Sequence, residues 1–205
     1  MNRISAVVFD FGGVMTPMTM PDRVRPVVDE LGIPWKALED GFAKYRRLMD
    51  GDFMTIDEMY AKIWADAGIE LDEKIHRRIL DEDTASFLYR NERTLEWMRV
   101  LKARGLKIGI LTNMCTDFAR RFRATFPDFI AVADAVVISG EERIYKPMRE
   151  IYDLCRERLG VPADEICFVD DVEGNCQGAR DAGWQALRFT GNEAAERELG
   201  RMLGD

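Results

Sequence analysis

The chain has 205 residues and a net charge of −8, and its apolar and charged fractions of 47% and 32% are those of a globular protein. The negative charge argues against nonspecific nucleic-acid binding, which needs Lys and Arg to neutralise phosphates. No apolar run is close to the roughly 20 residues that cross a bilayer, and the N-terminus lacks the pattern of a signal peptide. We therefore expect a cytoplasmic protein with neither nucleic acid nor membrane as a partner, while the sequence leaves its oligomeric state open.

The numbers of histidine and cysteine residues limit which metal sites and catalytic sites are possible. The only histidine is His76, and the four cysteines include no CxxC pair. This argues against a metal site or a catalytic triad built on imidazole or thiolate groups. We expect four free thiols, mostly in the core, and a site built from carboxylates, lysine and hydroxyl groups.

The first predicted element is a buried strand at residues 4–9, which ends directly before Asp10. Almost a hundred residues with little strand character follow it. Their apolar residues have helical spacing in four segments, residues 24–31, 38–48, 56–67 and 75–88. Because a βαβ unit of about 30 residues cannot contain this interval, we predict a helical domain inserted after the first strand, over residues 16–86.

Strands and helices alternate through the remaining chain. Short runs rich in Val and Ile predict strands at residues 107–111, 135–138, 166–169 and 185–189. Helical patterns lie between them, and Pro147 suits the first turn of one such helix. We predict an α/β fold, a Rossmann-like doubly wound parallel sheet formed by residues 1–15 and 87–205.

Polar residues follow several of the predicted strands. Asp10 comes after the first, Thr112 and Asn113 after the second, and Asp170 and Asp171 after the fourth, while Lys146 lies in the loop after the third. Functional residues of an open α/β sheet gather beyond the carboxyl ends of its strands. We therefore expect these side chains on one rim.

Four segments resemble, in order, the motifs of the haloacid dehalogenase superfamily. They are Phe9-Asp10-Phe11-Gly12-Gly13-Val14, Leu111-Thr112-Asn113, Lys146-Pro147 and Phe168-Val169-Asp170-Asp171. The predicted helical insertion is similar to the type-one cap of that family. The resemblance implies a hydrolase that acts on small phosphorylated molecules with Mg²⁺ as its cofactor.

The resemblance also implies roles for the acidic residues. Asp10 would attack phosphorus and form an aspartyl phosphate, which divides one difficult hydrolysis into two displacements. Mg²⁺ would be held by the Asp10 carboxylate, the Gly12 backbone carbonyl and the Asp171 carboxylate. Asp170 would stand behind these ligands and orient Lys146 or a bound water.

The phosphoryl group would be held by the other motif residues. Thr112 and the backbone amide of Asn113 would bind its oxygens, and Lys146 would offset the charge of nucleophile and phosphate. The helix after Asp171 would direct backbone amides at the same region, with Asn175 on its first turn. In the cap, Tyr45, Arg46, Trp64 and Tyr89 are candidate substrate contacts to which we assign no role.

Gly12 is the main departure from the family pattern, because most phosphatases of the superfamily have an aspartate there that protonates the leaving group. General acid–base help is typically worth about 10²- to 10⁴-fold in rate. The substitution favours substrates whose leaving group needs little protonation. Sugar 1-phosphates are one candidate, and Asp50-Gly51-Asp52 is similar to the cap pattern of a sugar-1-phosphate phosphatase subset.

Three alternatives stay open. A 2-haloacid dehalogenase has a tyrosine at the position of Gly12 and needs no metal. A phosphonate hydrolase needs a cap lysine, for which Lys36, Lys44 and Lys62 are available. A regulatory protein would keep the fold without catalysis.

Overall fold

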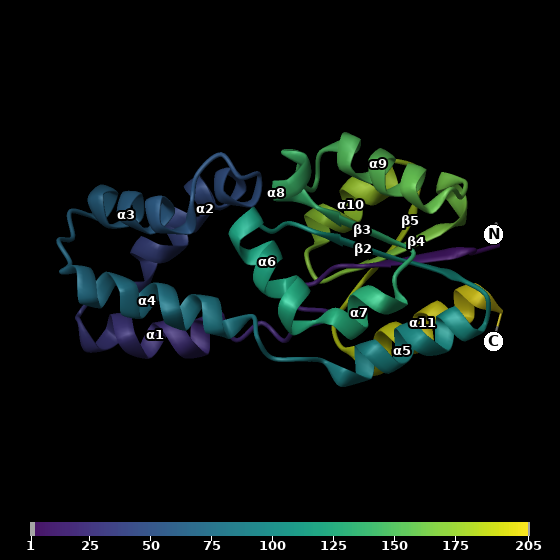
Figure 1. Cartoon of the computed structure of the whole chain (residues 1–205), viewed down its shortest axis with the longest axis horizontal. Helices are drawn as coiled ribbons and strands as arrows, with labels where there is room; N and C mark the ends of the chain where they lie inside the picture. Colours follow the sequence, from purple (N-terminus) through teal and green to yellow (C-terminus); the bar gives the residue numbers. More distant parts are fainter. Residues whose placement is uncertain (1–2, 205) are drawn as a thin grey trace.

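The computed structural model describes residues 3–204, so the outermost residues of the predicted core segments, 1–2 and 205, lie outside it. Five strands form the centre of the molecule (Figure 1). They are β1 (Ala6–Phe9), β2 (Lys107–Thr112), β3 (Ala135–Ile138), β4 (Ile166–Asp170) and β5 (Gln185–Arg188). All pair in parallel in the order β3-β2-β1-β4-β5, so the predicted parallel α/β sheet is confirmed.

Helices cover both faces of the sheet, as expected for a doubly wound fold. One face packs against α9 (Arg149–Leu159) and α10 (Glu173–Asp181). The other face packs against α5 (Glu92–Ala103), α6 (Thr116–Thr125), α7 (Pro127–Val132) and α11 (Asn192–Leu203). Because successive side chains of a strand point to opposite faces, Val7 and Phe9 join one hydrophobic cluster, whereas Ala6 and Val8 join the other.

Four helices lie between β1 and α5, where four helical segments were predicted, and Figure 1 shows them grouped at one end of the molecule. They are α1 (Met20–Glu30), α2 (Trp35–Asp50), α3 (Ile56–Ala67) and α4 (Glu73–Ser86). Their inward-facing apolar residues, among them Val24, Leu38, Met59 and Ile79, form a third hydrophobic cluster. The division of the chain into a core and an inserted domain over residues 16–86 stays a prediction.

The segment before α9 differs from the expectation. The helix begins at Arg149 with Met148 as its N-cap, so the prediction that Pro147 lies in its first turn is wrong. Pro147 belongs instead to a turn in which the Met148 amide donates to the Tyr145 carbonyl at 2.8 Å. The short α8 (Ser139–Glu142) and a 3₁₀ helix, η1 (Ala163–Glu165), complete the elements.

The four cysteines are buried and unpaired, as expected. Between residues 3 and 204, no helix combines the length and apolar character needed to span a membrane.

Candidate active site

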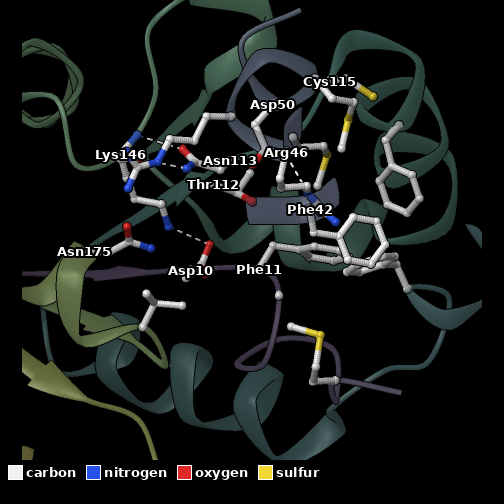
Figure 2. A pocket seen from close by; sticks show the side chains of 18 of the residues that line it. Asp10, Phe11, Phe42, Arg46, Asp50, Thr112, Asn113, Cys115, Lys146 and Asn175 are labelled. Carbon is white, nitrogen blue, oxygen red and sulfur yellow. Dashed lines mark hydrogen bonds and ion pairs between the residues drawn. The ribbon is translucent and has the colours of Figure 1, made fainter. Parts of the chain in front are cut away.

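The carboxyl ends of three neighbouring strands bring the predicted site residues together. Asp10 follows β1, Thr112 is the last residue of β2, and Asp170 is the last residue of β4. Lys146 reaches them from the loop after α8, and Figure 2 shows its side chain pointing at Asp10. The expectation of a single rim therefore holds in the geometry, because these parallel strands end at the same edge.

Lys146 is the centre of this group and is only 2% exposed. Its Nζ lies 2.8 Å from Asp10 Oδ1 and 2.7 Å from Asp170 Oδ2. It also donates to the Leu111 carbonyl at 3.1 Å. Although burial lowers the pKa of Lys146, the carboxylates of Asp10 and Asp170 raise it above the ordinary value. A buried ammonium is thus held charged against the candidate nucleophile.

Asp10 is also buried, and burial raises its pKa to about 8, against the lowering effect of Lys146. The nearby Asp170 and Asp171 add to the rise because they are like charges. A carboxylate must be ionised to act as a nucleophile. A further cation beside these acids would favour ionisation of Asp10.

Asp170 has its hydrogen-bonding capacity occupied by the protein. Besides the Lys146 contact, Oδ1 accepts from the Val172 amide at 2.8 Å, and both oxygens lie 3.1 Å from Asn175 Nδ2. The residue is fully buried. Its surroundings suit a fixed acceptor that holds Lys146 and Asn175 in place.

Asp171, the next residue, stands against the backbone of Gly13. A Cβ added to Gly13 would lie 2.4 Å from Asp171 Oδ2, and Gly13 has a φ of +74°. Only glycine combines this backbone conformation with such a close approach. Gly13 thus makes the space in which the Asp171 carboxylate lies.

The three carboxylates fit a hard divalent cation. Asp10, Asp170 and Asp171 each offer an oxygen, and these oxygens lie within 4.8 Å of one another. Mg²⁺ takes oxygen ligands of this kind and keeps several waters. Since Asp170 is already bonded to the protein, Asp10 and Asp171 are the better ligands in this set.

The structure gives the side chain of Asn113 a function that sequence reasoning did not find. Its Oδ1 accepts from the Lys146 amide at 2.8 Å, and its Nδ2 donates to the Lys146 carbonyl at 3.0 Å. This pair ties the loop after α8 to the end of β2 and fixes where Lys146 leaves the backbone (Figure 2). Sequence reasoning had considered only the Asn113 backbone amide as a phosphate contact, which stays a prediction.

A cavity of about 590 Å³ lies over the rim and extends to the helices α2 and α4. Asp10, Gly12, Thr112, Asn113, Lys146, Asp171 and Asn175 all line it. Of the candidate cap contacts Tyr45, Arg46, Trp64 and Tyr89, Arg46 alone is among the described residues that line the cavity. Lys36, Lys44 and Lys62 are not among those lining residues either.

Arg46 belongs to a polar cluster on the far wall of the cavity. Its Nε lies 3.0 Å from Asp50 Oδ1, and Figure 2 shows this contact beside Phe42. The neighbouring Asp83 accepts a hydrogen bond of 3.0 Å from Tyr60 and is 1% exposed. Arg46 lies in the predicted helical segment 38–48, but Asp50 lies beyond its predicted end, and nothing in the sequence directed Asp83 from another helix to the same wall.

Comparison with known proteins points to one family. A family model described as a hydrolase, haloacid dehalogenase-like hydrolase, matches residues 4–183. A phosphatase of Mycobacterium tuberculosis is 27% identical over 191 residues, which is 89% of this chain and 86% of that protein. An (S)-2-haloacid dehalogenase of Pseudomonas fluorescens is 24% identical over 212 residues, covering 97% of this chain and 90% of that protein.

Solved structures show the same fold. A HAD-like family hydrolase of Porphyromonas gingivalis matches with a TM-score of 0.76 at 16% identity, covering 100% of both chains. A HAD family enzyme of Bacteroides thetaiotaomicron, in complex with magnesium and inorganic phosphate, matches with a TM-score of 0.71 at 18% identity. That match covers 95% of this chain and 98% of the other.

Proposed function

We propose that this chain, which belongs to the haloacid dehalogenase-like hydrolases, is a Mg²⁺-dependent phosphatase of small phosphorylated molecules. Sugar phosphates are one candidate substrate class, and helices α1 to α4 are proposed to act as the cap over the site. The observation that carries the proposal is the buried Lys146 ammonium, 2.8 Å from Asp10 and 2.7 Å from Asp170, beside the partly buried carboxylate of Asp171.

Two displacements at phosphorus account for the reaction. An Asp10 carboxylate oxygen forms a bond to phosphorus while the bond to the ester oxygen breaks, and the leaving alkoxide takes a proton from water. Water then attacks the aspartyl phosphate, losing a proton to solvent, and releases inorganic phosphate and the Asp10 carboxylate. Each step leaves the phosphorus with four oxygen substituents.

The surrounding residues stabilise the charge that these steps move. Lys146 offsets the negative charge shared by Asp10 and the phosphoryl oxygens, and the Thr112 hydroxyl is available to donate to one of those oxygens. Asp170 and Asn113 keep Lys146 in position. When bound by Asp10, Asp171 and the Gly12 carbonyl, Mg²⁺ would neutralise further charge on the phosphoryl group.

Dehalogenation is the second candidate, because the relatives include (S)-2-haloacid dehalogenases. The charges of this site favour the phosphatase. A 2-haloacid is a carboxylate, and a metal-free site would place it beside Asp170 and Asp171 as well as Asp10. The three acids are better matched by a divalent cation than by another anion.

Hydrolysis of p-nitrophenyl phosphate with and without Mg²⁺ tests the proposal. We expect metal-dependent turnover that falls by at least about 10³-fold in Asp10→Asn, because this change removes the nucleophile. Asp81→Asn, the same substitution on the exposed surface of α4, serves as the matched control and keeps activity. Absence of turnover on every phosphate tested, together with halide release from 2-chloropropionate, would show that the chain is a dehalogenase.

A further inference from the structure

The surroundings of Gly12 identify what the leaving group meets. A Cβ at Gly12 would have the Met18 Cε at 3.9 Å and the Phe87 Cε1 at 4.0 Å as its nearest neighbours. Both side chains line the cavity. The place where a side-chain acid would stand is therefore bounded by a thioether and an aromatic ring, neither of which can give a proton to a departing alkoxide.

A leaving group in this place must depart without protonation by the enzyme. General acid help is worth about 10²- to 10⁴-fold, so its absence selects for esters of acidic alcohols. Phenols ionise at a pH of about 10, as the tyrosine side chain does, and aliphatic alcohols are far weaker acids. The lack of an acid at Gly12 thus favours a phosphate ester whose leaving group is a phenolic oxygen.

The wall beyond Gly12 is lined by apolar side chains that can contact a ring. Phe87 is in edge-to-face contact with Phe118 at 5.2 Å between ring centroids. Phe42 and Met18 line the same cavity, and Met18 is 49% exposed. Half-buried aromatic and thioether side chains around a cavity of this size favour stacking and edge contacts with an aromatic ligand.

Polar residues share this wall, since the Arg46 guanidinium lies 5.8 Å from the centroid of the Phe87 ring. Arg46 is paired with Asp50, and Asp83 accepts from Tyr60. Of the described residues on the α2 and α4 side of the cavity, this leaves Arg47, Thr84, the terminal nitrogens of Arg46 and the unpaired Oδ1 of Asp83 for a ligand. A sugar presents several hydroxyl groups, each of which loses a water contact when buried and needs a partner in return. The side chains of Met18, Phe42 and Phe87, against which the leaving group would lie, offer no strong hydrogen-bond partner.

From these observations we infer that the substrate is an aryl phosphate monoester, with its phosphate at Asp10 and Lys146 and its ring against Met18, Phe42 and Phe87. The inference rests on the proposed phosphatase activity. It narrows the substrate class from phosphorylated small molecules in general to esters of phenols.

Four substrates separate the requirement for an acidic leaving group from the requirement for an aromatic ring. Phenyl phosphate has a ring and an acidic leaving group, and cyclohexyl phosphate has a similar shape with a poor leaving group. Acetyl phosphate leaves well without a ring, and glucose 1-phosphate presents a polyol. We expect kcat/KM for phenyl phosphate to exceed that for cyclohexyl phosphate by at least about 100-fold, and that for glucose 1-phosphate by at least about tenfold. Glucose 1-phosphate hydrolysed as well as phenyl phosphate would overturn the inference.

Two variants test the contacts that carry the argument. Phe87→Leu should raise KM for phenyl phosphate about three- to tenfold relative to KM for acetyl phosphate, because an aromatic contact is lost. Phe53→Leu, at an exposed ring outside the cavity lining, is the matched control. A Cβ at Gly12 would make only ordinary van der Waals contacts, and Gly12→Asp should raise turnover of cyclohexyl phosphate by about 10²-fold while changing that of phenyl phosphate less. The inference would be contradicted if Phe87→Leu changed KM for phenyl phosphate and acetyl phosphate equally. It would also be contradicted if Gly12→Asp changed the turnover of cyclohexyl phosphate and phenyl phosphate equally.

A binding measurement separates failure of this inference from failure of the proposed function. With Mg²⁺ present, Asp10→Asn should bind phenylphosphonate at least about tenfold more tightly than methylphosphonate, as measured by calorimetry. If no phosphate ester is hydrolysed by the wild-type protein, the phosphatase proposal fails, and this comparison still decides whether the cavity selects a ring. Equal affinities would refute the ring site.

Discussion

Two adjacent aspartates at the end of β4 have opposite surroundings. Asp170 is fully buried and bonded to Lys146, Asn175 and the Val172 amide. The Asp171 carboxylate lies against Gly13, where any other residue would collide with it. The motif Asp170-Asp171 could be found from the sequence, but the environment that distinguishes the two acids depends on three segments, those of Gly13, of Lys146 and of Val172 with Asn175.

Asp83 is the acid whose burial should be visible in the pH dependence of stability. Burial raises its pKa above the ordinary value of 3.8, against the lowering effect of Arg46. As the pH rises past 3.8, the unfolded chain releases this proton while the folded chain retains it, so the folded state loses stability. The loss is complete once the pH exceeds the folded-state pKa.

Asp83→Asn removes this ionisation while keeping an acceptor for Tyr60. The difference in Tm between variant and wild type should therefore shift in favour of the variant as pH rises from 4 to 7, by about 2 °C or more. Thermal unfolding followed by circular dichroism at both pH values measures the difference. A difference that does not change with pH would show that Asp83 titrates normally, and Asp81→Asn is the exposed control.

At the scale of elements, local patterns were sufficient to predict all five strands and the four helices between β1 and α5. The strands are short apolar runs because both faces of a parallel sheet are covered. The meeting of helices α2 and α4 at the cavity wall was not predictable from such local patterns. Arg46 and Asp83 come from α2 and α4, and only tertiary packing places them on one cavity wall with Phe87.

The loop after α2 caps α6, one of the helices that cover the sheet. Asp52 Oδ1 accepts from the Thr116 amide at 3.1 Å and from its hydroxyl at 2.8 Å. Thr116 begins α6, whose own N-cap residue, Cys115, makes no capping bond with its side chain. A second contact runs beside it, since Ser139 Oγ donates to the Asp50 carbonyl at 2.5 Å and accepts from the Met114 amide at 2.8 Å.

Removal of this cap should loosen the start of α6. Asp52 has a φ of +60°, so Asp52→Gly removes the carboxylate and also relieves backbone strain. These two effects oppose each other in the overall Tm, and the local measure is hydrogen exchange of the Thr116 amide. We expect that exchange to be about fivefold faster in Asp52→Gly, because an N-cap is worth about 1 kcal/mol.

Asp52→Asn is the matched control, because asparagine tolerates this backbone conformation and caps equally well. Its Thr116 amide should exchange at nearly the wild-type rate. Equal protection in Asp52→Gly and Asp52→Asn would show that α6 does not depend on the loop after α2.

The proposed anionic substrate would approach a chain of net charge −8 whose site contains three clustered acids. Long-range attraction therefore cannot come from the protein alone. Lys146 supplies one positive charge, whereas the two carboxyl groups that contact it, those of Asp10 and Asp170, can carry two negative charges. By this charge balance, the proposed phosphate substrate would need a bound cation beside it.

Binding of that cation should stabilise the whole fold. A ligand that binds only the folded state at 100 times its Kd adds about 2.7 kcal/mol to the free energy of unfolding. For a chain of 205 residues, this corresponds to a rise in Tm of about 5–10 °C. We expect Mg²⁺ to produce this rise and EDTA to reverse it, as measured by scanning calorimetry.

The Asp171→Asn variant isolates the contribution of the metal site to this rise. Its side chain has nearly the same size, so the packing against Gly13 is kept while one ligand charge is lost. We expect the metal-free variant to unfold at or slightly above the Tm of the metal-free wild type, because burial and Asp170 raise the pKa of Asp171 and disfavour its charge. Addition of Mg²⁺ should then shift its Tm by less than about 2 °C. A full metal-dependent rise in Asp171→Asn would place the cation elsewhere, because a site that loses a charged ligand cannot retain the same binding free energy.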